Sequence, residues 1–367
     1  MEKEHPEKEN NDLEQLEMEN QGAIDNFNRQ RTSQVPWTVA PKDPQRFKVV
    51  FSGTAGEYFR IWIVNLFLTV LTLGIYAAWA RVRTRRYFHA HTLLAGQSFD
   101  YMANPWFILK GNLIIAAGFL LYLFAESYNP LYSSIVLIVF YLVLPFLIYK
   151  SLRFNAYNTA YRNIRFRFLG SLKESYKTYL LVPILIPLTL GLIVPYWMFR
   201  RKKYFFKNFC YGAATNSFKG ASGPFYRAYG MAGLLSVGLS ILFFAGIFGF
   251  GSMGKNLSID SGSLNKSLIL IPAASSLFIF AFFTFIQQYI FTRVTNYCWS
   301  RTSLESLHFQ SSLVARKLFW IRLSNILAIF ISFGLLIPWA KVRRARYILN
   351  RLIVIADTGL DDFTACL

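Results

Sequence analysis

FSGTAGEYFR, residues 51–60, is the stretch of sequence that decides the fold, because a related stretch, FLGSLKESYK, returns at residues 168–177. Both stretches have Gly at their third position, Glu at their seventh, an aromatic residue at their ninth and a base at their tenth. Similarity of this kind within one chain indicates repeated structural units, which must be recognised before single elements are assigned.

The segments that follow these stretches agree even more closely. The first copy continues into GIYAAWARVRTRRY (74–87), the middle copy into GLIVPYWMFRRKKY (191–204), and a third, shorter copy ends in GLLIPWAKVRRARY (334–347). We therefore predict two full copies and a third partial copy. The predicted divisions are a disordered acidic N-terminal tail at 1–45, repeat 1 at 46–160, repeat 2 at 161–300 and a partial repeat 3 at 301–367.

The composition indicates that lipid surrounds most of the chain. Hydrophobic residues make up 54% of it and charged residues only 16%. Most of its uncharged apolar runs approach the roughly 20 residues that a helix needs to cross a bilayer. These runs lie at 61–80, 111–125, 131–149, 179–199, 231–254, 267–291 and 323–340. The expected fold class is an all-α multi-pass membrane protein.

The formal net charge of +20 does not indicate a nucleic-acid partner. Acidic residues gather in the tail, the bases stand at the ends of apolar runs, and no nucleic-acid-binding motif accompanies them. Bases in these places are typical of a cytoplasmic membrane face, where anionic lipid headgroups attract them. We expect the lipid bilayer as partner, with anionic lipids at the cytoplasmic face and the N-terminal tail on that side.

The charges around each run also predict the topology. The connection between runs 111–125 and 131–149, and the one between 231–254 and 267–291, are poor in bases, whereas both flanks of the three repeated runs are basic. The basic flanks of successive copies lie on the same side of the membrane only if each repeat unit crosses the membrane an even number of times. We expect four transmembrane helices in two hairpins, and three re-entrant or spanning segments that turn near Gly74, Gly191 and Gly334. Seven crossings are the alternative.

Short alternating stretches outside the apolar runs predict minor β-structure. Residues 46–51, 163–168 and 352–355 are rich in β-branched or aromatic residues and too short to span a bilayer. We expect them to form small strands at the cytoplasmic face that pair across the copies.

A family resemblance follows from the first copy. Its residues 53–65 read GTAGEYFRIWIVN, with Gly53, Glu57 and Asn65, and they continue through TLGIYAAWARVR (72–83) to FDY at 99–101. This pattern resembles the YjgN-like group of bacterial inner-membrane proteins, over roughly residues 46–366. The resemblance implies a multi-pass protein of a bacterial inner membrane. That family has no assigned function, so the resemblance supplies no catalytic or binding residue.

Sequence signatures of catalysis are missing. No nucleophile elbow, HExxH or P-loop pattern occurs, and the three cysteines show no CxxC spacing. His89 and His91 are the only close histidine pair, and two imidazoles alone make a weak metal site. We expect no metal site and no cofactor, and the sequence leaves enzymatic activity open but unsupported.

Two sets of side chains are candidate functional residues. Polar groups in or near the repeated runs are costly in lipid and often face a protein interior or a water path, although simple interfacial ion pairs would explain those at the starts of the runs. They are Glu57, Arg60, Asn65, Glu174, Lys177, Arg322 and Asn325. Basic clusters at the ends of the runs are candidate contacts to anionic lipid. They are Arg81, Arg83, Arg85, Arg86, Arg200, Arg201, Lys202, Lys203, Lys341, Arg343, Arg344 and Arg346.

Two function classes fit this sequence. The first is a transport or channel-like module for a small solute or ion, in which broken helices meet near mid-membrane. The alternative is a non-enzymatic protein that organises the membrane or binds anionic lipid. The sequence does not identify a substrate, a protein partner or an oligomeric state.

Overall fold

The computed structural model describes residues 44–256 and 261–357, so the predicted acidic tail lies almost entirely outside the described residues. The helices are α2 (Ala55–Leu71), α3 (Ala77–Ala90), α4 (Pro105–Tyr128), α5 (Pro130–Tyr157), α6 (Leu172–Tyr176), the π-helix η1 (Lys177–Leu181), α7 (Val182–Leu188), α8 (Val194–Asn208), α9 (Gly223–Asn256), α10 (Ser261–Ser300), α11 (Ala315–Ile331) and α12 (Ile337–Leu349). The strands are β1 (Gln45–Phe51), β2 (Thr92–Leu94), β3 (Gln97–Tyr101), β4 (Thr159–Tyr161), β5 (Ile164–Phe168), β6 (Phe209–Tyr211), β7 (Asn216–Phe218), β8 (Thr302–Leu304), β9 (Leu307–Ser311) and β10 (Leu352–Ala356).

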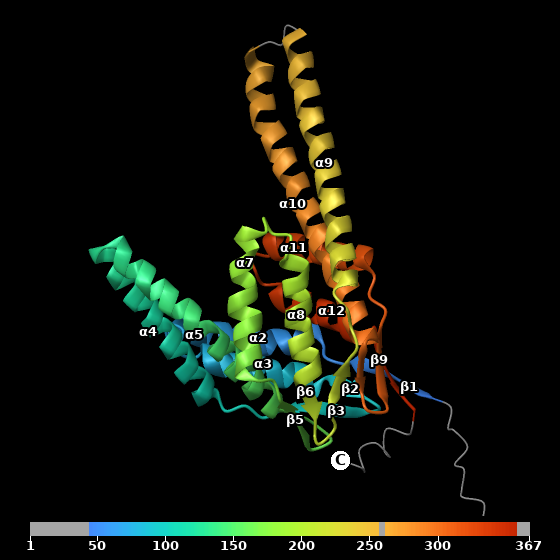
Figure 1. The fold of residues 1–367 in the computed structure, drawn as a ribbon. Helices are drawn as coiled ribbons and strands as arrows, with labels where there is room; N and C mark the ends of the chain where they lie inside the picture. Colours follow the sequence, from blue (N-terminus) through green and yellow to red (C-terminus); the bar gives the residue numbers. More distant parts are fainter. Residues whose placement is uncertain (1–43, 257–260, 358–367) are drawn as a thin grey trace, which may run out of the picture. The chain divides into compact units, whose positions relative to one another are not determined.

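Four helical stretches in the described part of the chain are long and apolar enough to cross a membrane. They are Pro105–Tyr128, Pro130–Tyr157, Gly223–Gly246 and Ser275–Ser300. They pair as two hairpins, α4 with α5 and α9 with α10 (Figure 1). Their apolar side chains are largely exposed, as lipid-facing side chains are. The prediction of four such helices is confirmed.

The three remaining apolar runs each form a helix, a tight turn and a second helix. α2 and α11 contain 17 residues each, about 25 Å of helix, and then the chain reverses. The turns have two successive positive φ angles, 50° and 93° at Leu73 and Gly74 and 49° and 92° at Phe333 and Gly334. Glycine adopts this left-handed conformation without steric cost.

The middle hairpin has the same turn but a less regular first leg. Gly191 has a φ of 83°, and its N–H donates to the carbonyl of Ile186 at 2.9 Å. The first leg is divided into α6, η1 and α7. Pro183, which lies just after η1, has no N–H to donate to the helical ladder, and this accounts for the local change in hydrogen bonding.

One antiparallel sheet gathers all ten described strands. Its order is β6-β5-β4-β3-β2-β1-β10-β9-β8-β7, and paired backbone hydrogen bonds between Tyr211 and Ala214 link the two edges, so that the sheet nearly closes into a ring. The described chain is mostly helical, as predicted, but the prediction of only minor strands is wrong, because the strands form one large sheet. Most of these strands are only three to five residues long, too short for alternation to reveal them in the sequence.

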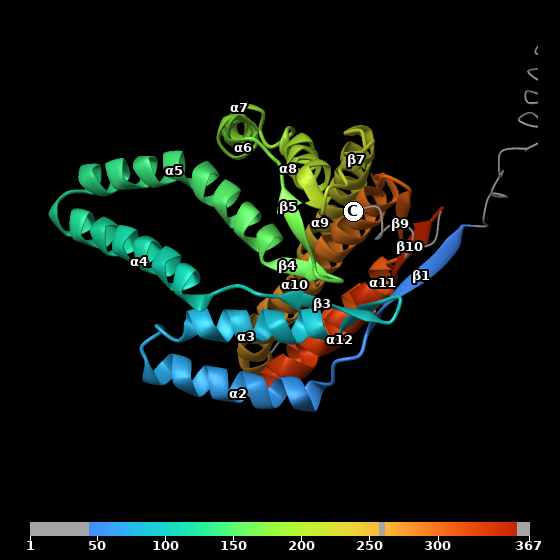
Figure 2. The same cartoon turned by 90° about the horizontal axis from the view of Figure 1, so that it is seen from below.

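The first and last strands of this sheet join the two ends of the described chain. β1 pairs with β10, with Gln45 opposite Ala356 and Lys48 opposite Ile353, and the two lie side by side in Figure 2. The strands predicted at 46–51, 163–168 and 352–355 fall in β1, β5 and β10. The expected pairing between distant strands is confirmed for β1 with β10.

Each helical hairpin in the described chain is closed at the sheet by one backbone hydrogen bond. The residue after one strand donates its N–H to the carbonyl of the residue before the next strand. These pairs are Ser52 to His91 (3.0 Å), Met102 to Asn158 (2.8 Å), Leu169 to Asn208 (2.8 Å), Lys219 to Arg301 (3.0 Å) and Ser312 to Arg351 (3.1 Å). Both ends of every hairpin therefore lie at the same sheet, and an odd number of crossings within a hairpin does not fit this geometry.

Candidate functional site

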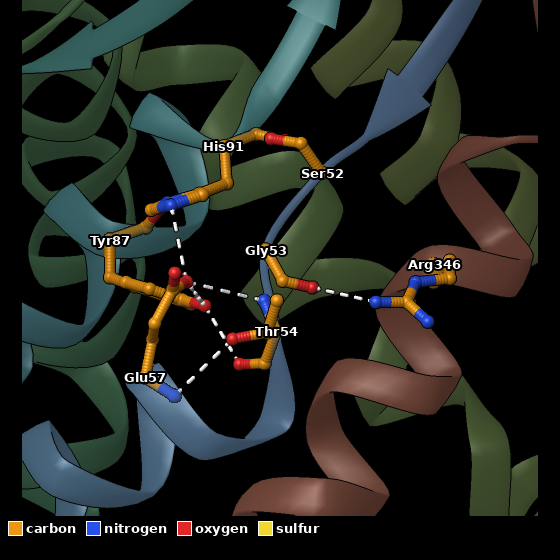
Figure 3. A network of polar contacts seen from close by, with 7 residues as sticks. All are labelled: Ser52, Gly53, Thr54, Glu57, Tyr87, His91 and Arg346. Atoms are coloured by element: carbon orange, nitrogen blue, oxygen red, sulfur yellow. Dashed lines mark hydrogen bonds and ion pairs between the residues drawn. The ribbon is translucent and has the colours of Figure 1, made fainter.

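The start of α2 is held by a network of polar contacts (Figure 3). Thr54 and Glu57 form a capping box, in which each side chain accepts from the backbone N–H of the other. The Tyr87 hydroxyl at the end of α3 donates to the Thr54 carbonyl at 2.8 Å and lies 3.2 Å from Glu57 Oε2. His91 Nε2 lies 3.6 Å from the same carboxylate oxygen. The network therefore fastens the two legs of this hairpin together.

The charges in this network are tuned by these contacts. Hydrogen bonds from Thr54 and then Tyr87 lower the pKa of the Glu57 carboxyl below its ordinary value. Burial, followed by the neighbouring Glu57 carboxylate, raises the pKa of Tyr87 to about 12. Glu57 is thus an anion and Tyr87 a neutral donor near neutral pH. The Glu57 side chain is well exposed to solvent, as expected for a helix cap.

The middle hairpin repeats this arrangement with different partners. Ser171 caps α6 by accepting from the Glu174 N–H at 3.2 Å, and the Tyr204 hydroxyl donates to the Ser171 carbonyl at 3.1 Å. Asn208 donates to the Glu174 carboxylate at 3.4 Å. Glu57 and Glu174, predicted as candidate site residues, therefore both contribute to the closure of a hairpin.

A basic cavity of about 520 Å³ lies where the start of α2 meets α11 and α12. Within the described part of the chain, its lining contains three guanidinium groups and no carboxylate. The lining residues are Ala55, Ile321, Trp339, Val342, Arg343, Arg346, Tyr347, Asn350 and Arg351. The contacts between α2 and α12 that form this cavity join the beginning of the described chain to its end.

The arginines of the basic cavity are positioned by neighbouring groups. Arg343 donates to Ser324 Oγ at 2.7 Å and to Asn325 Oδ1 at 3.1 Å, and its guanidinium lies 4.9 Å from the centre of the Trp339 ring. Arg346 donates to the Gly53 carbonyl at 2.8 Å (Figure 3). Each guanidinium has five N–H donors, so these contacts leave donors for a bound group.

Such an arrangement suits an anion with several oxygen atoms. Arginine presents its donors as a planar fork that matches carboxylate and phosphate oxygens, and stacking on an aromatic ring holds that fork in place. No carboxylate of residues 44–256 or 261–357 stands in the lining to neutralise the three positive charges. The basic cavity is therefore the candidate functional site that the geometry supports best.

Comparison with known proteins gives the family. Residues 46–366 match the family described as bacterial protein of unknown function, DUF898. The chain belongs to this family. "Inner membrane protein YjgN" of Salmonella typhimurium is 29% identical over 160 residues, which are 42% of this chain and 40% of that protein. YjgN of Escherichia coli K12 is 31% identical over 150 residues, 39% of this chain and 36% of that protein.

These relatives confirm the resemblance to YjgN-like proteins, and they are named for the inner membrane. The matched segments span less than half of each relative's length. No solved structure matches the chain. With its apolar helices, this DUF898 protein is an inner-membrane protein of unknown function.

The other predicted polar residues of the DUF898 protein do not meet in one site. Asn325 donates to the Ala340 carbonyl at 3.1 Å and accepts from Arg343, so it supports the basic cavity. Asn65 is buried in α2, and neither polar atom of its side chain has a hydrogen-bond partner among the described residues. Arg60 and Lys177 are exposed, and Arg322 is half-buried.

The predicted basic residues fall into three groups. Arg343 and Arg346 line the basic cavity. Arg85 donates to the Tyr101 hydroxyl at 2.8 Å and to Asn155, so it ties α3 to β3 and α5. The remaining ones are exposed or half-buried: Arg81, Arg83, Arg86, Arg200, Arg201, Lys202, Lys203, Lys341 and Arg344.

Sequence reasoning missed part of the basic cavity. Arg351, Asn350 and Trp339 line it, yet only Trp339 belongs to the repeated pattern. Arg351 lies beyond the basic cluster and just before β10. A single base next to a strand does not by itself indicate a binding site. Within the described part of the chain, no group of three or more His, Cys, Asp or Glu side chains is arranged to hold a metal ion.

Proposed function

We propose that this DUF898 protein binds the phosphate-bearing headgroup of an anionic lipid in its basic cavity. The observation that carries the proposal is the set of three arginines, Arg343, Arg346 and Arg351, around one cavity with no carboxylate in its lining. Two of these arginines are already held by protein hydrogen bonds, which lowers the entropy lost on binding an anion.

A lipid fits this cavity better than a free anion because exposed apolar surface continues from it along α2 and α11. This surface includes Val64 and Phe67 of α2 and Trp320 and Leu327 of α11. An anionic headgroup at the basic ends of these helices would leave its chains beside their apolar surface. The same reasoning puts these basic ends, the sheet and the N-terminal tail on the cytoplasmic side of the membrane.

We also propose that the three hairpins that turn at Gly74, Gly191 and Gly334 descend from one repeated unit, with divisions at 46–160, 161–300 and 301–367. Their matching turn geometry supports a common origin. Because both ends of each hairpin lie at the sheet, they are re-entrant in this proposal, and α4, α5, α9 and α10 alone cross the membrane.

Native mass spectrometry of the detergent-purified protein tests the lipid proposal. We expect added phosphatidylglycerol to bind, phosphatidylcholine to bind more weakly, and replacement of Arg343, Arg346 and Arg351 by Gln to abolish this preference. The matched control replaces the exposed Arg81, Arg83 and Arg86 by Gln, removing the same charge elsewhere. An equal loss of preference in both triple variants would mean that diffuse surface charge, rather than the cavity, selects the lipid.

Transport of a small solute or ion is a second candidate, favoured by Asn65. Its side chain is only 5% exposed, and both of its polar atoms are without a hydrogen-bond partner. A buried, unsatisfied polar group in a membrane protein often marks a functional path. Flux of labelled small ions into vesicles containing the protein, lost on Asn65→Leu, would support transport, and the same leak in protein-free vesicles would argue against it.

A further inference from the structure

A second cavity, of about 500 Å³, lies inside the nearly closed ring of strands, and we call it the ring chamber. All ten strands contribute to its lining, and so do the last turns of α3, α8, α10 and α12. It is separate from the basic cavity, with which it shares no lining residue. The interior of an eight-stranded barrel is filled by side chains or by one small ligand, and the diameter grows with the number of strands. A ring of ten strands therefore leaves room for a ligand.

The lining of the ring chamber is apolar and aromatic. Typical members are Leu94, Phe166, Trp299, Leu304 and Val354. The few polar lining groups are mostly occupied by the protein itself: Thr92 Oγ1 donates to the Phe88 carbonyl at 2.7 Å, Thr159 Oγ1 donates to the Asn155 carbonyl at 2.9 Å, and His89 Nδ1 lies 2.8 Å from the Arg85 carbonyl. Asn216 Oδ1, which has no hydrogen-bond partner among the described residues, is an exception. A bound water needs two to four polar partners, of which this atom supplies one.

One side of the ring chamber is closed by packed side chains. Tyr161 donates to the Leu94 carbonyl at 2.8 Å, and Tyr211 donates to the Tyr161 carbonyl at 2.9 Å. These tyrosines pack with Val49, Ala214, Leu304 and others in the main buried cluster of the sheet. The other side is formed by the ends of helices, where Phe88, Phe206 and Leu349 reach the chamber.

Bases stand on the same helix ends. Arg86 lies two residues before Phe88, Lys207 directly follows Phe206, and Arg301 follows Trp299 by two positions. A ligand that fills the chamber with hydrocarbon and carries an acidic group would find a cation at whichever of these ends it passes. An apolar chamber beside basic helix ends suits an amphiphilic ligand that has one long hydrocarbon chain and an acidic group.

We propose that the ring chamber binds a single long hydrocarbon chain, either the acyl chain of a membrane phospholipid or a free fatty acid. A volume of about 500 Å³ lies in the range of ordinary small-ligand pockets, which run from about 300 to 1,000 Å³. The proposal is independent of headgroup binding in the basic cavity, because different residues carry it.

Fluorescence of Trp299 tests the proposal directly, since Trp299 lines the chamber. Detergent-purified, delipidated protein is titrated with stearate brominated on its chain, and in parallel with phosphatidylglycerol brominated on one chain. The Trp299 signal is the difference between the protein and its Trp299→Phe variant. We expect saturable quenching of that signal by at least one probe, and the effective probe distinguishes fatty acid from phospholipid.

Matched substitutions show whether the quencher occupies the chamber. Val354→Phe and Leu94→Phe place a phenyl ring in its lining, whereas Ile353→Phe and Leu93→Phe place the same ring one position away, on the opposite face of the same strands. We expect the first pair to remove quenching and the second pair to retain it.

Two results would overturn the proposal. One is quenching of Trp299 that is unchanged in both chamber-filling variants. The other is no quenching of Trp299 by either probe in the protein with its natural chamber, a measurement that does not depend on how well the variants fold. Loss of phosphatidylglycerol selectivity in the arginine variants would leave the chamber quenching intact, so failures of the two proposals are distinguishable.

Discussion

Tyr87, Tyr204, Tyr297 and Tyr347 each lie five residues before a strand and fasten the end of one helix to the start of another. The hydroxyls of Tyr87 and Tyr204 donate to the carbonyls of Thr54 and Ser171, whereas those of Tyr297 and Tyr347 accept from the N–H groups of Ala221 and Val314 in their shortest contacts. The distances range from 2.7 to 3.1 Å. Because either a donor or an acceptor satisfies a hydroxyl, one residue type serves four of the five described hairpins.

Removing one of these hydroxyls should loosen its hairpin. We expect Tyr87→Phe to lower the free energy of unfolding by about 1 kcal/mol, because the contacts to Thr54 and Glu57 are lost while the ring stays. Thermal unfolding in detergent measures the change. Tyr128→Phe is the matched control, since its side chain is 71% exposed at the end of α4, and equal effects of the two substitutions would contradict a fastening role for Tyr87.

The residues of the candidate sites also differ in whether the sequence alone identified them as candidates. Glu57 and Asn325 stood out because they recur at matching positions, and each makes contacts that join elements. Arg351 and Trp299 did not stand out, because a base or an aromatic residue near the end of an apolar run is ordinary in membrane proteins. Only the packing of α12 and of the strands gives these two residues a cavity to line.

At the scale of elements, the three short hairpins depend on a reversal that only a few residues form without strain. The N–H of Gly74 donates to the Thr69 carbonyl and that of Gly334 to the Ile329 carbonyl, each at 2.8 Å. Each bond joins the glycine N–H to the carbonyl of the residue five positions earlier, as in the Schellman motif that ends many helices. The glycine rather than the surrounding apolar sequence therefore sets the length of the first leg.

Two glycines of the first hairpin should respond oppositely to alanine. A Cβ atom would meet no neighbour within 4 Å at either Gly56 or Gly74, but only Gly74 has a positive φ, of 93°. We expect Gly74→Ala to destabilise the protein by about 1 to 3 kcal/mol through backbone strain, and Gly56→Ala, in helix α2, to stabilise it by up to about 1 kcal/mol. If the unfolding midpoints of both variants were higher than that of the parent protein, or both were lower, this reasoning would be refuted.

At the scale of the whole described chain, helical hairpins and strand pairs alternate, and each hairpin returns to the sheet that it left. The last β-pair is made by β1 and β10, from opposite ends of the described chain. This closure brings α2 against α12 and so creates the basic cavity. It also encloses the ring chamber, to which every strand contributes.

The topology is testable in intact bacterial cells. Single cysteines replace Ala90, Ser127 and Lys207 in a protein whose own cysteines are changed to alanine, and an impermeant thiol reagent is added outside the inner membrane. We expect labelling of Ser127→Cys, in the last turn of α4, and protection of the other two, because Ala90 and Lys207 lie at the sheet ends of their hairpins. Permeabilised cells serve as the control for reactivity, and labelling of Ala90→Cys or Lys207→Cys before permeabilisation would contradict a sheet on the cytoplasmic side.

The sequence alone determined that lipid surrounds much of this protein, and it predicted the four long apolar helices and the positions of three helix reversals. These features depend on hydropathy, glycine and proline, which act locally along the chain. The sequence predicted three of the strands for the same reason. The sheet as a whole was decided by the tertiary structure. Strands of three to five residues carry little periodicity, and their partners are chosen by which hairpin ends meet, as when β1 meets β10 from the far end of the chain. Both cavities depend on those long-range contacts, so no local stretch of sequence could reveal them.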